Sequence, residues 1–181
     1  PGYADDFQDF LDGVDFLNKK DFENAFKKLK GPAESGNPIA QHWVGLMYEG
    51  GLGGVAKDYK EAVKWYRLSA ENGDVRSQHK LGWMYKRGLG VQQDLKEAFK
   101  WWKSAAEYGH ANAQYLIALM YEEGAGIFQD VNEAIKWLRL AAEEEGHVER
   151  EHGHVDAQFR LGFKYYNGES VPQDYEEAEK W

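Results

Sequence analysis

Residues 113–146 read AQYLIALMYEEGAGIFQDVNEAIKWLRLAAEEEG, and related stretches lie on both sides of them. Residues 40–73 read AQHWVGLMYEGGLGGVAKDYKEAVKWYRLSAENG, and residues 77–109 read SQHKLGWMYKRGLGVQQDLKEAFKWWKSAAEYG. Residues 157–181 begin the same pattern with AQFRLGFKYYNGESVPQDYEEAEKW. The shared tryptophans Trp65, Trp101 and Trp137 are 36 residues apart in both steps. Recurrence at a period of about 20–50 residues is typical of repeat proteins, so residues 1–181 are predicted to form one repeat array.

Each repeat is predicted to contain two helices joined by a glycine-rich loop. Gly45 lies in the middle of the first helix, where glycine costs about 1 kcal/mol relative to alanine. We expect this cost to be offset by close approach of the partner helix. Asp58 and Glu61 resemble a capping box at the start of the second helix. Gly73 is expected to end that helix in a left-handed conformation. One stripe of the second helix is predicted to be buried: Ala62, Trp65, Tyr66, Ser69 and Ala70.

The predicted boundaries divide the chain into a capping hairpin and four repeats. Residues 1–36 contain two amphipathic helices and are expected to cap the array. The spacing of Gly13, Phe16, Phe22 and Ala25 resembles that of a tetratricopeptide unit. The repeats are predicted at residues 37–73, 74–109, 110–153 and 154–181. The third is lengthened by an inserted loop at about residues 145–153, and the fourth is incomplete.

The pattern A-x-x-x-L-G-x-M-Y, then G-x-G-V, then D-x-x-x-A-x-x-W resembles the Sel-1-like repeat family, which is related to the tetratricopeptide repeats. The resemblance runs from residue 38 to residue 181, with Ala118 in place of glycine and Lys164 in place of methionine as departures. It implies an all-α fold, a right-handed solenoid of stacked antiparallel helical hairpins. It also implies a non-catalytic adaptor or scaffold for protein partners, in bacteria often at the cell envelope.

Composition limits the partners. A net charge of −9 argues against a nucleic-acid binder, which needs a basic face. The absence of cysteine excludes disulfides and thiolate metal sites. No apolar run reaches the roughly 18 residues of a membrane helix, so membrane insertion is not expected. The chain begins at Pro1 without methionine, which, with the resemblance, favours an exported or periplasmic location over a cytoplasmic one.

Catalytic and cofactor motifs are not found, so no enzyme activity and no cofactor are predicted. The glycine loops follow no strand and match no phosphate-binding motif. Ser69 and Ser77 occupy positions where other repeats have alanine, which predicts packing rather than nucleophilic chemistry. The alternative is a cell-wall-active or other hydrolase with a site in the groove of the solenoid.

The inserted stretch EEEGHVEREHGHVDA contains weak candidates for metal ligands, namely His147, His152 and His154. The near-duplication GHVEREHGHVD accounts for this local density of histidine without a ligand role. A solvated extension is therefore favoured, and a metal-responsive module is the alternative.

A partner is expected on the concave face, which the first helix of each hairpin lines in the related tetratricopeptide arrays. Aromatic and aliphatic side chains beside cations are typical of binding hot spots. The cations are expected to select acidic or C-terminal carboxylate groups. Packing between repeats is the competing explanation for these positions. The candidate residues are Trp43, Leu46, Lys80, Trp83, Lys86, Leu116, Leu119, Arg160 and Phe163.

The last stripe of apolar residues, Tyr175, Ala178 and Trp181, is predicted to be exposed. Terminal repeats normally present a polar outer face. Either further repeats cover this stripe, or it packs on another copy of the chain.

Overall fold

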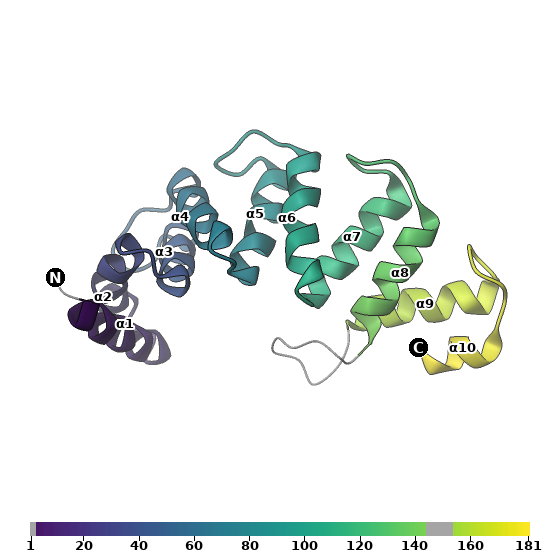
Figure 1. Cartoon of the computed structure of the whole chain (residues 1–181), viewed down its shortest axis with the longest axis horizontal. Coiled ribbons are helices and arrows are strands. Elements are labelled where there is room, and N and C mark those ends of the chain that lie inside the picture. The colour runs from purple at the N-terminus through teal and green to yellow at the C-terminus, as the bar shows by residue number, and fades with distance from the viewer. Residues whose placement is uncertain (1–2, 144–153) are drawn as a thin grey trace. The chain divides into compact units, whose positions relative to one another are not determined.

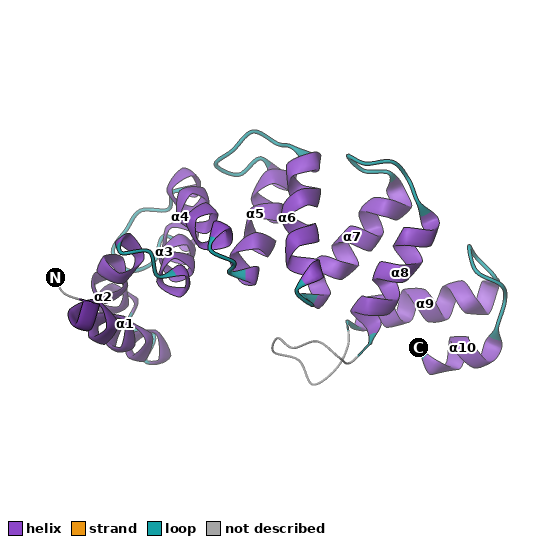
Figure 2. Ribbon diagram, in the orientation of Figure 1, coloured by secondary structure: helices purple, strands orange, loops and turns teal. Residues whose placement is uncertain are grey.

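The computed structural model describes residues 3–143 and 154–181. Over these residues the chain forms ten helices and no strand. Figure 1 and Figure 2 show how these helices follow one another along the chain. The helices are α1 (Tyr3–Asn18), α2 (Phe22–Glu34), α3 (Pro38–Gly50), α4 (Tyr59–Glu71), α5 (Val75–Arg87), α6 (Leu95–Glu107), α7 (Ala111–Glu123), α8 (Val131–Ala142), α9 (Val155–Asn167) and α10 (Tyr175–Lys180). The all-α prediction is therefore confirmed.

The chain divides into two compact units, residues 1–94 and 95–181. In the first unit α1 packs on α2 and α3 on α4, while α2 contacts α3 and α4 contacts α5. In the second unit α7 packs on α8 and α9 on α10, while α6 contacts α7 and α8 contacts α9. Each unit is thus a stack of helices in which sequence neighbours are spatial neighbours, as expected for helical repeats.

Aspartate side chains cap the second helices. Asp58 Oδ1 accepts hydrogen bonds from the backbone N–H groups of Lys60, at 2.8 Å, and Glu61, at 3.1 Å. Asp130 and Asp174 accept in the same way at the starts of α8 and α10. The backbone N–H of each of these aspartates donates to a carbonyl near the end of the preceding first helix, for Asp58 that of Tyr48. Aspartate therefore both starts the second helix and closes the loop before it.

A glutamine ties each first helix to the end of the preceding second helix. Its side-chain amide donates to a backbone carbonyl in the last turn of that helix. The donor–acceptor distances are 3.0–3.3 Å, and the role was not expected from the sequence. The pairs are Gln41 to Ala33, Gln78 to Ala70, Gln114 to Ala106 and Gln158 to Ala142.

The interior of the α3–α4 hairpin is packed as predicted except at Trp65. Ala62, Tyr66, Ser69 and Ala70 are buried, and Trp65 is half-buried. A Cβ atom on Gly45 would lie 2.8 Å from the Tyr66 ring, so the close approach expected at this glycine is present. The neighbour is the aromatic side chain of the partner helix rather than its backbone.

Gly90 and Gly73 offer a matched test of this packing. Both have positive φ, +71° and +88°, but a Cβ on Gly90 would lie 2.2 Å from the Tyr59 carbonyl oxygen, whereas Gly73 has open space. We expect Gly73→Ala to cost about 1–2 kcal/mol of unfolding free energy from backbone strain alone. Gly90→Ala should cost roughly 1–3 kcal/mol more because the loop must move off α4. Urea denaturation followed by circular dichroism measures both, and equal losses would contradict the close contact.

Candidate functional site

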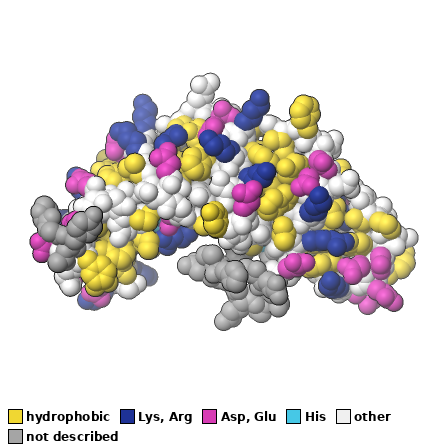
Figure 3. All heavy atoms as spheres, viewed as in Figure 1, with side chains coloured by type: hydrophobic (Ala, Val, Ile, Leu, Met, Phe, Trp, Pro, Cys, Tyr) yellow, Lys and Arg dark blue, Asp and Glu magenta, His cyan; other side chains and the backbone are white. Residues whose placement is uncertain are grey.

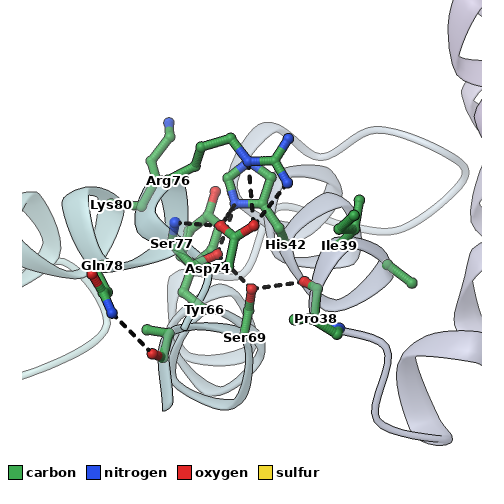
Figure 4. A network of polar contacts seen from close by, with 12 residues as sticks. Pro38, Ile39, His42, Tyr66, Ser69, Asp74, Arg76, Ser77, Gln78 and Lys80 are labelled. Carbon is green, nitrogen blue, oxygen red and sulfur yellow. Dashed lines mark hydrogen bonds and ion pairs between the residues drawn. The ribbon is translucent and has the colours of Figure 1, made fainter. Parts of the chain in front are cut away.

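A buried polar network joins α3, α4 and the start of α5 (Figure 4). His42 Nδ1 lies 2.8 Å from Ser77 Oγ. Ser77 Oγ donates to Ser69 Oγ at 2.8 Å, and Ser69 Oγ donates to the Pro38 carbonyl at 2.7 Å. Because the Ser77 hydrogen points to Ser69, Ser77 must accept from His42, which places the proton of the neutral imidazole on Nδ1. Ser69 and Ser77 are buried as predicted, and they also hydrogen bond.

This network has the residue types of a catalytic triad but not its geometry. In a triad the serine and the carboxylate contact opposite nitrogens of the imidazole. Here the carboxylate of Asp74 lies 3.6 Å from Nδ1, the same nitrogen that contacts Ser77. Ser77 is also 0% exposed, so a substrate cannot reach its hydroxyl. These three residues therefore hold α3 to α5 and are not arranged for nucleophilic attack.

Burial determines the charge state of the network. It lowers the pKa of His42 to about 4, although the nearby Asp74 carboxylate favours the charged imidazole. Arg76 and Lys80 add to the lowering. Burial would raise the pKa of Asp74, but hydrogen bonds from the Arg76 side chain and the Ser77 backbone outweigh it and lower that pKa. At neutral pH the network therefore contains a neutral histidine and an ionised aspartate.

His42 should make the protein sensitive to mild acid. Between its ordinary pKa of 6.5 and about 4, the unfolded chain binds a proton that the folded chain excludes, so stability falls as the pH falls through this window. The loss attributable to His42 is expected to reach up to about 3 kcal/mol. His42→Asn retains a donor but does not titrate, and its stability should fall less between pH 7 and pH 5. Urea denaturation at several pH values measures both proteins; parallel pH profiles would contradict a buried neutral His42.

The first unit contains a groove of about 420 Å³. The first helices of three successive repeats contribute to it: α1 through Leu17, α3 through Trp43 and Leu46, and α5 through Lys80. Three of the predicted partner-binding residues therefore lie together. The complete lining is Leu17, Phe22, Trp43, Leu46, Met47, Glu49, Gly50, Leu52, Lys57, Tyr59 and Lys80.

Lys80 has a partner inside the protein. Its Nζ lies 3.0 and 3.2 Å from the two carboxylate oxygens of Glu49, which also accepts a hydrogen bond from the Tyr66 hydroxyl. This ion pair joins the first helices of neighbouring repeats, α3 and α5. The positive charge of Lys80 is therefore matched by Glu49, a pairing that was not predicted.

The second unit repeats this arrangement. Arg160 and Phe163 line a groove of about 450 Å³ together with Tyr115, Phe159 and Lys164. Arg160 Nη1 lies 2.9 Å from Glu122 Oε2, and its Nε donates to the Tyr115 hydroxyl at 3.1 Å. Arg160 and Lys80 occupy equivalent repeat positions, as do Glu122 and Glu49. The ion pair between consecutive first helices thus occurs in both units.

The other predicted partner-binding residues lie outside these two grooves. The Trp83 indole N–H donates to His79 Nε2 at 3.2 Å, and its ring faces Lys86 and Arg87. Leu116 is 9% exposed and Leu119 is half-buried. Packing within the chain accounts for Leu116, whereas Leu119 retains some exposed surface.

Among the weak metal candidates, His154 caps α9: its Nδ1 accepts from the Ala157 backbone N–H at 3.4 Å, and its ring stacks on Tyr115. His147 and His152 lie outside the described residues. Within the described part of the chain, no group of three or more histidine and acidic side chains is arranged to hold a metal ion.

On the face drawn in Figure 3, hydrophobic side chains are interspersed with charged ones of both signs. None of the helices in residues 3–143 and 154–181 has the length and apolar character needed to cross a membrane.

Helical hairpins that stack through a repeated glutamine and a repeated capping aspartate define a helical-repeat protein. The Sel1 repeat model matches residues 38–74, 75–110, 111–145 and 155–181, and the chain belongs to the Sel1 repeat family. Members of this family are generally non-catalytic scaffolds for protein–protein interaction.

Solved structures agree with this assignment. A Sel1 repeat protein from Oxalobacter formigenes is 34% identical with a TM-score of 0.83, over 94% of this chain and 67% of that chain. The protein c5321, described as a protective antigen present in uropathogenic Escherichia coli strains, is 31% identical with a TM-score of 0.84. That match covers 95% of this chain but 36% of the longer relative. The comparison with curated proteins found no match.

Proposed function

We propose that this chain is a non-catalytic adaptor that holds a peptide segment of a protein partner in the groove lined by Trp43, Leu46 and Lys80. The observation behind the proposal is that three consecutive first helices contribute to one groove. This is the face that the family resemblance predicts to be concave. Repeat solenoids use such faces for binding.

The groove suits side chains of a peptide rather than a flat protein surface. Its volume of about 420 Å³ lies within the range of about 300–1,000 Å³ seen for ligand sites. Trp43 and Leu46 are half-buried, so each retains apolar surface that a partner can cover. Burying one bulky apolar side chain there contributes roughly 1.5–3 kcal/mol. Useful affinity therefore requires several contacts along the groove.

The hydrolase alternative has little support in this groove. Among the described residues that line it, Glu49 supplies the one carboxylate, and both of its oxygens contact Lys80. A hydrolase of the kind considered needs a second carboxylate or an activated nucleophile. Binding without chemistry is the simpler function for this lining.

Truncating the two apolar anchors tests the adaptor proposal. The ligand is a partner captured from a lysate of the source organism or a peptide selected from a random library. It should bind the double variant Trp43→Ala/Leu46→Ala at least about tenfold more weakly than the parent, because hot-spot truncations each cost more than about 1 kcal/mol. Leu68→Ala, on the exposed side of α4, is the matched control and should bind normally. Circular dichroism confirms folding. Equal binding by both variants would place the partner elsewhere.

We also propose that the outer face of α9 and α10 associates with a second copy of the chain. Phe159, Phe163, Tyr166 and Tyr175 are 72%, 54%, 60% and 57% exposed and line a groove of about 480 Å³. At the position equivalent to Phe159, His42 is covered by Ser77 of the next repeat and Tyr115 is contacted by Arg160. This face therefore presents apolar surface at positions that the next repeat contacts elsewhere in the chain, and exposed apolar patches of this kind mark interaction sites.

Sedimentation velocity over a range of concentrations tests the association. The parent chain should shift toward a dimer as concentration rises, because apolar contact drives the pairing. Phe159→Glu/Phe163→Glu should raise the dissociation constant at least about tenfold, since charges would be buried. Phe128→Glu changes a residue that is 96% exposed in the α7–α8 loop and should leave association unchanged. A parent that remains monomeric throughout would contradict this proposal.

A further inference from the structure

The charges around the groove of the first unit do not cancel. Its lining contains the cations Lys57 and Lys80 and the carboxylate Glu49. The Glu49 carboxylate already forms an ion pair with Lys80, which joins α3 and α5. One positive charge, that of Lys57, is left over at the groove. This local excess is notable because the whole chain has a net charge of −9.

Lys57 is exposed and faces an aromatic ring rather than a carboxylate. Its Nζ lies 4.7 Å from the centroid of the Tyr59 ring, a cation–π contact that holds the ammonium group beside an apolar wall. Over the described residues, no ion pair involves Lys57 within 4.0 Å. Because the ammonium group is not neutralised, it remains available to a negative group on a ligand.

The neighbouring acidic residue does not compete for this charge. The Oδ1 atom of Asp58 accepts from the backbone N–H groups of Lys60 and Glu61, so its carboxylate is turned toward the start of α4. The backbone nitrogen and Cβ of Lys57 lie 3.2 and 3.3 Å from where a Cβ on Gly51 would be, so these two segments of the loop pack closely. The side chain of Lys57 therefore starts from a closely packed backbone, and its ammonium group lies over the Tyr59 ring.

The rest of the lining is suited to a bulky apolar group. Phe22, Trp43, Leu46, Leu52 and Tyr59 surround the groove, and Lys57 lies beside Tyr59 at its rim. A ligand that places an apolar side chain among these residues brings its adjacent backbone to the rim. A carboxylate one or two residues away along the same peptide can then reach Lys57.

We infer that the groove recognises an internal segment of a protein partner in which a bulky apolar residue lies next to an aspartate or glutamate, with Lys57 as the residue that selects the acid. The inference rests on the proposed adaptor function and names the partner chemistry for that same groove. Lys57 takes the role that the sequence analysis gave to Lys80, because the charge of Lys80 is already matched by Glu49.

Peptide selection tests the inference directly. A random library displayed with both ends of each peptide joined to other residues is selected on the full chain. Enriched sequences are then synthesised with blocked termini and measured by fluorescence anisotropy. We expect an apolar residue beside Asp or Glu to recur. Lys57→Glu should weaken binding at least tenfold, and the effect should shrink as salt rises.

Lys60→Glu is the matched control, because it makes the same charge change three residues away, on an exposed side chain outside the groove lining. It should weaken binding by less than about threefold through the long-range field alone. Replacing the peptide acid with its amide should weaken binding to the parent and abolish the difference between the parent and Lys57→Glu, which is the signature of a direct pair.

The outcomes separate this inference from the function on which it rests. Three results would each overturn the role assigned to Lys57. The enriched peptides could contain no acid, or Lys57→Glu and Lys60→Glu could weaken binding equally. Binding could also require a free C-terminal carboxylate. If such peptides still lose affinity to Trp43→Ala/Leu46→Ala, the adaptor groove is retained. Peptides that are insensitive to all of these substitutions would overturn both proposals.

Discussion

The glutamine near the start of each first helix imposes the constraint on which the stacking depends. Gln41, Gln78 and Gln114 are buried between consecutive hairpins, where an unpaired polar group costs about 1–3 kcal/mol. A carbonyl at the end of the preceding second helix accepts from the side-chain amide, as in the bond from Gln41 to Ala33. The insertion before residue 154 does not disturb this register. Gln158 still bonds to Ala142, and the His154 N–H still bonds to the Ala141 carbonyl at 2.7 Å.

Because this repeated bond and the small residues around it hold the hairpins, the remaining positions of the first helix are free to differ. The position of His42 illustrates this freedom. Here an imidazole joins a serine chain that no other repeat can form, since Ser77 is replaced by alanine in the other repeats. The equivalent Tyr115 stacks on His154, and the equivalent Phe159 is exposed. The same backbone therefore supports a buried polar contact, an aromatic stack and an open surface.

The fold was predictable from the sequence because its determinants recur at a fixed spacing. Asp58, Gly45 and the stripe containing Tyr66 each have a local physical role, and each was identified before the structure. The candidate site was predictable only in part. Trp43 and Leu46 do line a groove, whereas Leu116 is buried. The sequence could not separate these two cases, because helical periodicity does not distinguish a groove from an interface between repeats.

The cations show why the remaining residues of the candidate site could be identified only from the folded structure. Lys80 and Arg160 stand out in the sequence as positive charges among aromatic residues, yet Glu49 and Glu122 neutralise them across consecutive first helices. An ion pair between residues 31 or 38 positions apart has no local signature, and its partially exposed geometry makes it worth at most about 1 kcal/mol. Lys57 lies in a loop outside the helical pattern, where no periodicity marks it. Lys57 is singled out because its charge remains after the other cation of the groove, Lys80, has been assigned to an ion pair. Which charges are paired depends on the folded chain and not on any single repeat.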